Sequence, residues 1–433
     1  MRLFPSRLLL LAVFFSCARA QPAPQPAQFP QAAAGPARPA APPADAQLQT
    51  QTGPGLYASA SSAPVELVES WPVETTLDHQ DVRDAKDVWL EQIAGARRSL
   101  DFAEFYASNQ AGSALEKVVA AVEAAAARGV KVRWLGEEKF YKTYPETMDR
   151  LGRAPGAEVR RFDVAKVMGG VLHAKYFLVD GQELYLGSQN FDWRSLEHIQ
   201  ELGLRVREPA VVAALKDVFE LDWALQAGAP RPKATVTAAQ FPVRTELGAL
   251  TFVASPKEFL PDEALWDLPR LVQLIDSAKA SVRVQVLTYR ARGRGAFPEL
   301  EEALQRAANR GVKVELLVSD WSKRKSTIGG LKALHAPPNL TVKMMTVPPF
   351  SGGHVPFARV VHAKYLVVDG QRAWVGTSNW EKDYFFKSRN VGLIIDGGPL
   401  PARLDAFFAD NWNGRYVETL DPAAEYVAPR TGE

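Results

Sequence analysis

The sequence predicts an α/β protein built from two duplicated α/β/α halves. Each half is expected to hold a mixed, mainly parallel sheet flanked by helices, and the two pack as a pseudo-dimer with one active site at the interface. Two observations predict this class. The chain repeats once along its length, and each copy reads strand, helix, glycine, strand, which is typical of a parallel βαβ unit. The composition, 47% apolar and 23% charged, is that of a globular protein.

The first part of the repeat contains the strands and helices of this unit. Residues 99–106 alternate like a strand, and the Ala- and Val-rich stretch 114–127 follows as a helix. In the second half, residues 281–289 are the strand and 300–309 the helix. Arg-Gly-Val-Lys-Val begins the next strand in both copies, and equivalent residues lie 182 apart. This regularity indicates two copies of one fold.

The spacing between the copies changes once, and this change helps to place the domains. From the pair His173 and His362 onward, equivalent residues lie 189 apart. The second half therefore holds an insertion of seven residues before its histidine. Residues 226–261, which contain Ala-Gly-Ala-Pro-Arg-Pro, are typical of a connection. We expect a first domain over 65–228 and a second over 250–425.

The amino-terminal segment predicts export. Residues 1–20 begin with two arginines, continue with an apolar stretch and end in Ala-Arg-Ala, which is the order of a signal peptide. The apolar stretch is shorter than the ~20 residues that span a bilayer, which disfavours a membrane anchor. Lipidation at Cys17 is also disfavoured, because Phe14 stands where a small branched residue is needed. We expect a secreted or periplasmic protein.

The segment that follows predicts a disordered tether. Residues 21–64 are almost wholly Ala, Pro, Gln, Ser and Gly, so little can be buried. Cys17 is the only cysteine, and the mature chain can form no disulfide. The chain has 51 Lys and Arg against 49 Asp and Glu, and removal of the signal peptide leaves it close to neutral. Any attraction for phosphate must therefore come from local clusters.

The second part of the repeat carries side chains suited to chemistry. Each copy reads His-Ala-Lys, four largely apolar residues and Asp, and then glycine, a hydroxyl residue, one further residue and Asn. Side chains at i and i+2 of a strand share a face, so each His and Lys can reach one ligand. A duplication has no structural reason to keep His, Lys and Asn twice. The paired residues are His173, Lys175, Asp180, Ser188 and Asn190 in the first copy and His362, Lys364, Asp369, Thr377 and Asn379 in the second.

Two copies of HxKxxxxD followed by GSxN or its close variant resemble the phospholipase D superfamily. The resemblance covers most of the chain between Ser99 and Trp412. Phrases such as Asn-Phe-Asp-Trp-Arg-Ser at 190–195 resemble the endolysosomal phospholipase D three and four branch. Members of that branch act as exonucleases on single-stranded DNA and RNA, and lipid transphosphatidylation is also ascribed to them. This chain lacks the cysteines of that branch, so the substrate is not carried over.

The resemblance implies a metal-independent phosphodiesterase without a cofactor. One imidazole would attack phosphorus and the other would protonate the leaving oxygen, so that a phosphohistidine divides one difficult displacement into two easier steps. The charged non-bridging oxygens would be neutralised and oriented by Lys175, Lys364, Asn190 and Asn379. The remaining histidines show no metal-ligand spacing; they are His79, His198, His335 and His354.

One asymmetry between the copies predicts which histidine attacks. Glu201 follows His173 at the position where the resemblance implies a carboxylate on the second ring nitrogen, whereas Asn390 follows His362 at the same spacing. A carboxylate there stabilises the cationic ring that forms on attack. We therefore expect His173 to be the nucleophile, supported by Glu201, and His362 the acid. The alternative is that Glu201 only pairs with a neighbour such as Arg205.

The other residues are expected to support or recruit. Asp180 and Asp369 should brace the halves or the strand ends, and Ser188 and Thr377 should offer small donors. Two basic loops could attract phosphate or be plain solvated loops, and several aromatic residues could stack on bases, contact lipid or lie in the core. The loops contain Arg290, Arg292, Arg294, Lys323, Arg324 and Lys325, and the aromatic residues are Trp321, Trp380, Tyr384, Phe385 and Phe386.

Three functions remain open at this point. The first is hydrolysis or transfer of phosphodiesters in phospholipid or single-stranded nucleic acid. The second is a single-strand exonuclease without lipid activity. The third is an inactive surface-binding protein, which predicts the loss of a motif His or Lys, although all four are present. A phospholipid substrate would bring transient contact with a membrane surface, and no obligate protein partner is expected.

Overall fold

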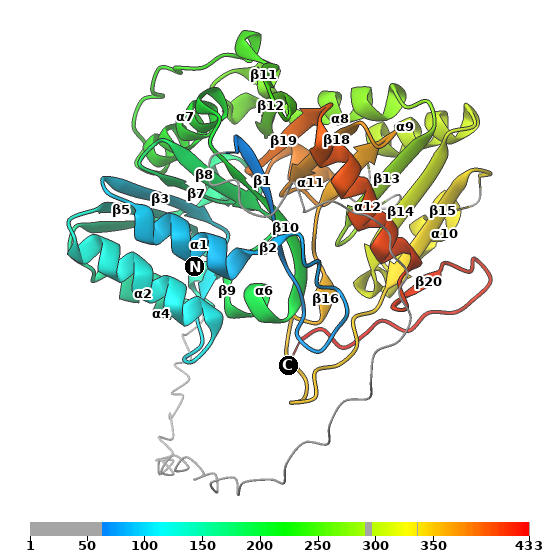
Figure 1. The fold of residues 1–433 in the computed structure, drawn as a ribbon, viewed down its shortest axis with the longest axis horizontal. Coiled ribbons are helices and arrows are strands. Elements are labelled where there is room, and N and C mark those ends of the chain that lie inside the picture. Colours follow the sequence, from blue (N-terminus) through cyan, green and yellow to red (C-terminus); the bar gives the residue numbers. More distant parts are fainter. Residues whose placement is uncertain (1–62, 291–296, 336, 433) are drawn as a thin grey trace, which may run out of the picture. The chain divides into compact units, whose positions relative to one another are not determined.

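The computed structural model of the chain describes residues 63–290, 297–335 and 337–432. The expected signal peptide and nearly all of the expected tether lie outside those residues. The described part holds two nine-stranded sheets, and helices pack against them (Figure 1). The predicted α/β class and its two duplicated halves are confirmed.

The first half builds its sheet in the order β2-β1-β10-β8-β7-β3-β5-β6. Its main helices are α1 (Ala85–Gly95), α2 (Ala114–Ala127) and α7 (Pro209–Gln226). The side chain of Ser113 caps α2, which buries valines on one face. The strands are β1 (Val65–Ser70), β2 (Arg83–Asp84), β3 (Ser99–Glu104), β5 (Lys131–Glu137), β6 (Ala157–Phe162), β7 (Lys175–Val179), β8 (Glu183–Gly187) and β10 (Ile199–Val206).

The second half repeats this topology in the order β11-β12-β19-β18-β17-β13-β14-β15-β20. Its main helices are α8 (Asp267–Asp276), α9 (Pro298–Asn309) and α12 (Pro399–Asn413). The strands are β11 (Val243–Thr245), β12 (Gly248–Ser255), β13 (Ser281–Val286), β14 (Lys313–Ser319), β15 (Leu340–Met345), β17 (Tyr365–Val368), β18 (Arg372–Gly376), β19 (Asn390–Asp396) and β20 (Val417–Thr419).

Parallel pairs do not predominate in either sheet, and this part of the prediction was wrong. Only β3-β5-β6 and β13-β14-β15 form the expected parallel units, while β7 and β17 pair antiparallel with both neighbours. The reason is the tight turn at Asp180-Gly181 and Asp369-Gly370, where all four residues have positive φ. A two-residue turn of this kind joins antiparallel strands, because a parallel connection needs a long crossover.

The turn aspartates brace the ends of strands. Asp180 accepts hydrogen bonds from the backbone N–H groups of residues 97–99, and Asp369 accepts them from residues 279–281. These bonds hold the pKa of both carboxyls below the ordinary value, although burial opposes the shift. Each turn is thereby tied to the start of the neighbouring strand, β3 or β13.

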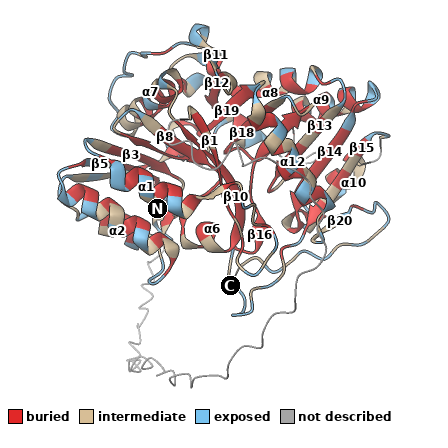
Figure 2. Cartoon of the chain, viewed as in Figure 1, coloured by how far each residue is buried: buried red, intermediate tan, exposed pale blue. Residues whose placement is uncertain are grey.

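One hydrophobic core is shared by the two halves. It includes Leu202 and Phe219 from the first half and Phe252 and Phe407 from the second, so α7 and α12 both contribute to it. Two further cores lie under α1 and α2 and under α8 and α9. Figure 2 shows buried residues running through both sheets. The halves are therefore joined by the same apolar packing that builds each of them.

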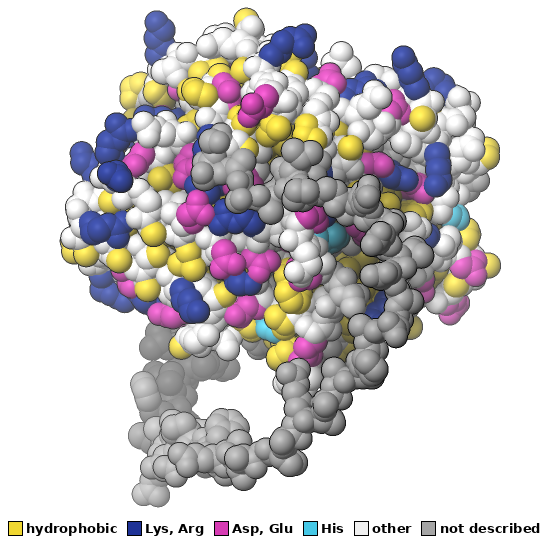
Figure 3. Space-filling view, viewed as in Figure 1, with side chains coloured by type: hydrophobic (Ala, Val, Ile, Leu, Met, Phe, Trp, Pro, Cys, Tyr) yellow, Lys and Arg dark blue, Asp and Glu magenta, His cyan; other side chains and the backbone are white. Residues whose placement is uncertain are grey.

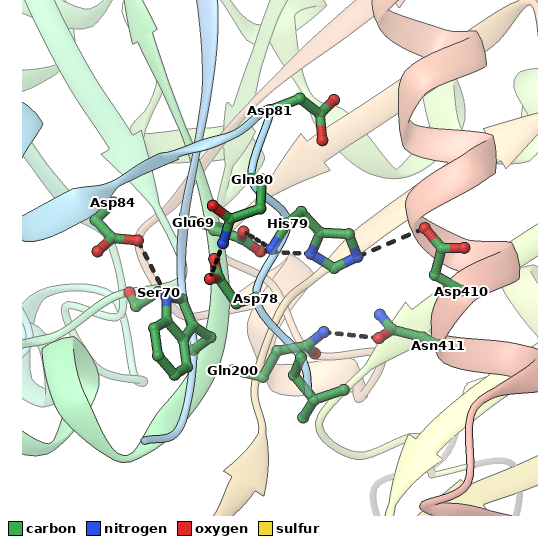
Figure 4. A network of polar contacts seen from close by, with 12 residues as sticks. Glu69, Ser70, Asp78, His79, Gln80, Asp81, Asp84, Gln200, Asp410 and Asn411 are labelled. Atoms are coloured by element: carbon green, nitrogen blue, oxygen red, sulfur yellow. Dashed lines mark hydrogen bonds and ion pairs between the residues drawn. The ribbon is translucent and has the colours of Figure 1, made fainter. Parts of the chain in front are cut away.

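Polar contacts also cross between the halves. His79 binds the buried Glu69 of β1 through Nδ1 at 2.9 Å and stacks on Phe407 of α12, and its Nε2 lies 3.7 Å from Asp410 (Figure 4). Gln200 of β10 donates to Asn411 of α12 at 2.9 Å. These contacts fix α12 against β1 and β10.

The surface carries charges of both signs. On the face drawn in Figure 3, Lys and Arg side chains are interspersed with Asp and Glu. Among the described helices, none is long and apolar enough to cross a bilayer.

Candidate active site

The two histidines lie at the junction of the halves because the residues just before each histidine pair with the backbone of the opposite half. Leu172 bridges Arg389, and the N–H of His173 donates to the Arg389 carbonyl at 3.0 Å. In the other half β16 (Val360–Val361) pairs parallel with β10, and the N–H of His362 donates to the Gln200 carbonyl at 2.8 Å. Each histidine is thus held by the backbone of the opposite half.

As a result, each histidine meets the side-chain partner that was expected for the other. Glu201 accepts a hydrogen bond from Nδ1 of His362 at 2.8 Å, and Asn390 contacts Nδ1 of His173 at 3.1 Å. The prediction that Glu201 supports His173 was therefore wrong, and so was the alternative pairing with Arg205, whose guanidinium binds Glu183 and Glu91. Glu201 and Asn390 are equivalent residues, and each follows the residue whose carbonyl holds the other half's histidine.

The hydrogen bonds around Asn390 fix the proton on His173. The Asn390 amide donates from Nδ2 to the carbonyls of Tyr384 and Ser388, while its Oδ1 accepts from the hydroxyl of Thr377 at 2.9 Å. The oxygen therefore faces His173, so Nδ1 of that ring is the donor. Nε2 is left as the reactive nitrogen of His173, and the Glu201 bond leaves Nε2 of His362 in the same state.

Glu201 is fully buried beside two hydroxyls. Burial raises the pKa of its carboxyl to about 7, although Lys364 and the nearby hydroxyls of Ser195 and Ser188 lower it. Ser188 also accepts from the N–H of Leu202 at 3.0 Å. Thr377 is the counterpart of Ser188. Each hydroxyl lies beside the residue, Asn390 or Glu201, whose side chain contacts a histidine ring.

The two lysines lie behind the histidines. Lys175 donates to the carbonyl of His173 and Lys364 to that of His362, both at 2.5 Å. Burial lowers the pKa of Lys175 to about 7, and it also lowers the pKa of Lys364 well below its ordinary value. Burial also lowers the pKa of both histidines, and the positive charges of the two lysines add to this effect. A site that crowds four basic groups around the buried carboxyls of Glu201 and Glu104 is suited to binding an anion.

A pocket of about 340 Å³ opens onto both histidines and onto Asn190 and Asn379. Trp321 and Tyr384 line it as predicted for aromatic contacts, while Trp380 and Phe385 lie in the second-half core. The predicted basic loops do not line it within the described residues: Lys323 pairs with Glu418, and Arg292 and Arg294 lie outside those residues. The remaining lining residues are Phe105, Tyr106, Phe140, Thr143, Tyr144, Arg194, Ile199, Leu287, Phe357 and Val360.

The sequence prediction missed residues at the end of β3. Phe105 packs edge-on against His173 at 5.0 Å between ring centroids, and Nζ of Lys175 lies 4.8 Å from its ring. Glu104 is buried, is paired with Lys175 across the strands, and has its pKa raised by burial. The signal was available, because a carboxylate at the end of an apolar strand is unusual. Tyr384 was considered for stacking on bases, for lipid contact or for the core, yet its ring packs at a right angle to that of His173.

No group of three or more potential metal ligands occurs among the described residues. The charge of a bound phosphodiester would be met by Lys175, Lys364, Asn190 and Asn379.

Two α/β halves that bring paired histidines and lysines to one interface define a phosphodiesterase of the duplicated HxKxxxxD class. The chain belongs to the phospholipase D family: the family model described as "Cardiolipin synthase, PLD-like domain" matches residues 89–223 and 271–412, one match in each half. The chain is thus an enzyme that acts on phosphodiesters.

Named relatives divide between nucleic acid and lipid enzymes. The chain is 33% identical over 404 residues to "5'-3' exonuclease PLD3" of Bos taurus, covering 83% of this chain and 81% of the relative. It is 29% identical over 401 residues to "Phospholipase D Z" of Dictyostelium discoideum, covering 86% and 94%. It is 32% identical over 368 residues to the "Virion nicking-joining enzyme" of Vaccinia virus, covering 77% and 84%.

A solved structure shares the fold. Phosphatidylserine synthase of Haemophilus influenzae superposes with a TM-score of 0.55 at 11% identity, over 77% of this chain and 85% of that one.

Proposed function

We propose that this enzyme cleaves single-stranded nucleic acid through a phosphohistidine on His362, with His173 as the general acid and base. The observation that carries the choice of substrate is an aromatic pocket with one exposed large apolar side chain, Phe357, at its rim within the described residues. Among the described residues only two large apolar side chains are exposed, Phe357 and Val427. An enzyme that takes phospholipid from a bilayer needs a larger apolar face to dock.

The walls of the pocket suit nucleobases. Tyr106 stacks on Tyr144 at 5.1 Å, and Phe105 packs on Phe140 at 4.2 Å. Aromatic faces bind bases of any sequence, because every base has a π-face. The named exonuclease and nicking-joining relatives support this choice over lipid.

The crossed partners support these chemical roles. In the first step Nε2 of His362 attacks phosphorus, and the Nδ1–H bond to Glu201 stabilises the positive charge that develops on the ring. The P–O bond breaks as cationic His173 gives its proton to the leaving oxygen. In the second step a water attacks phosphorus and gives its proton to His173 while the P–N bond breaks. Glu201 remains the partner of His362 throughout.

The test compares two substrates under one set of conditions. Purified protein is incubated with a labelled single-stranded oligonucleotide or with phosphatidylcholine vesicles, in EDTA to suppress contaminating metal-dependent nucleases. We expect release of nucleotides and no release of choline. His362→Ala should release neither product. Choline release without oligonucleotide cleavage would overturn the proposal.

We also propose that the chain is exported by cleavage of residues 1–20 and acts as a secreted or periplasmic protein. The supporting pattern is the charged, apolar and small-residue order of that segment. Cell fractionation and amino-terminal sequencing should give an exported chain that begins at Gln21. An intracellular chain that retains its first residues would contradict this.

A further inference from the structure

The loop that precedes His362 is longer than its counterpart in the first half. Phe162 and Met345 end the equivalent strands β6 and β15. The segment 163–172 then leads to His173, whereas the longer segment 346–361 leads to His362. Most of the insertion in the second half therefore lies in the loop 346–359. In Figure 1 this loop, between β15 and β16, runs beside the carboxyl-terminal tail.

The loop holds two residues in an unfavourable backbone conformation. Phe357 has φ 58° and Arg359 has φ 55°. For a bulky side chain such as Phe this region is rare, and it persists only where the surroundings impose it. Strain of this kind is found most often at ligand sites.

Several hydrogen bonds, most of them to residues outside the loop, impose this conformation. The Arg359 guanidinium donates to the carbonyls of Pro348 and Val73, both at 2.8 Å, and the Arg359 N–H donates to the carbonyl of His198 at 2.9 Å. Next to Phe357, the Arg194 guanidinium binds the Pro356 carbonyl at 3.1 Å, and the N–H of Phe357 binds the Thr431 carbonyl at 2.7 Å.

These anchors keep an apolar ring in solvent. The side chain of Phe357 is 46% exposed, and it lines the same pocket as His173 and His362. Next to it Val360 packs with Ile199 in a small apolar cluster. A ring whose backbone is held in place at the mouth of the pocket loses less conformational entropy when a flat ligand stacks on it.

We propose that Phe357 determines specificity by stacking on a nucleobase next to the scissile phosphodiester, so that the enzyme recognises a base as well as the sugar-phosphate chain. This inference rests on the proposed function. It gives the inserted loop a role that the catalytic residues do not account for. A stacked base contributes about tenfold or more to binding by alanine substitution.

The experiment compares an intact single-stranded oligonucleotide with the same sequence carrying abasic residues on both sides of the cleaved bond. For wild type, kcat/KM should be about tenfold higher on the intact strand. Phe357→Ala should lower this ratio, chiefly through KM, and Phe357→Trp should keep it. Val427→Ala is the matched control, because Val427 is 88% exposed and does not line the pocket; it should keep the wild-type ratio.

The outcomes separate this inference from the proposed function. If Phe357→Ala leaves the ratio unchanged, whether activity is kept or lost equally on both strands, the stacking role is overturned while nucleic acid cleavage stands. If wild type cleaves neither strand but releases choline from vesicles, the proposed function itself has failed before any variant is compared.

Discussion

At the scale of single residues, the crossed histidine partners support the proposal that His362 carries the covalent intermediate. Glu201 hydrogen-bonds His362, and the neutral Asn390 contacts His173. A carboxylate stabilises the cationic ring of a phosphohistidine better than an amide does. We therefore propose His362 as the nucleophile, in place of His173, which the sequence predicted.

Trapping the intermediate tests this assignment. We expect a phosphoryl adduct on His362, stable in base and labile in acid, and it should accumulate in His173→Ala with a substrate that has an activated leaving group. With ordinary substrate, His173→Ala should lose about 10²- to 10⁴-fold in kcat, the usual contribution of a general acid. Mass spectrometry after alkaline denaturation locates the adduct, and an adduct on His173 would reverse the roles.

The pH profile follows from the surroundings of His173. Burial, Lys175, Lys364 and His362 all lower the pKa of this ring, and the acid must be protonated to act. Activity is thus present below that pKa and is lost as pH rises through it, so the alkaline limb of kcat/KM should lie below pH ~6.5. A wild-type rate that still rises at pH 8 would contradict His173 as the acid.

Substitution of Asn390 should move this limb. Asn390→Asp places a negative charge next to Nδ1 of His173. This charge should raise the pKa of His173 and shift the alkaline limb upward by about one unit or more. Glu201→Gln is the matched control: it should slow attack by His362 and leave the limb in place. An unmoved limb in folded Asn390→Asp protein would show that position 390 does not govern the acid.

At the scale of elements, the strand-turn-strand units could have been predicted more fully. The repeat predicted the helices and the parallel units, because those follow from apolar periodicity. The antiparallel placement of β7 and β17 was also encoded, since Asp-Gly between two apolar runs is a strong hairpin signal. The partner of Glu201 was not encoded, because its spacing from His173 along the chain is the same whether Glu201 meets that histidine or the one in the other half.

The turn aspartates should contribute to stability. Asp369→Ala removes the acceptor of three backbone N–H groups and should lower the free energy of unfolding by about 2 kcal/mol. Asp180→Ala should cost a similar amount. Asp383→Ala is the control, because its exposed pair with Lys387 contributes ~0.5 kcal/mol or less. Urea denaturation measures all three, and equal effects would contradict the bracing role.

At the scale of the whole molecule, the shared core and a buried ion pair join the halves. Arg389 of the second half binds Asp222 of α7 at 2.7 Å, with both side chains fully buried, and also binds the carbonyls of Ser255 and Phe259. The residue after Arg389 is Asn390, and the carbonyl of Arg389 holds His173. The joint between the halves is thereby built into the active site.

Breaking this pair should destabilise the entire described fold. Arg389→Met leaves Asp222 buried without a partner and should cost about 3–5 kcal/mol, whereas the double variant Arg389→Met, Asp222→Leu should recover part of that loss. Because the core is shared, unfolding in urea should remain one transition in every variant. Two separate transitions in wild type would show that the halves fold independently.

Each histidine ring is held by the opposite half, and this explains how the two rings can have different partners. In a symmetric dimer of identical halves, each ring would meet the same residue from the opposite copy, and a change of that residue would alter both rings alike. Fusion of the copies into one chain removes this constraint. Glu201 and Asn390 occupy equivalent positions, yet one ring has a carboxylate and the other an amide. The proposed division of labour between nucleophile and acid therefore rests on a difference that two identical halves could not have.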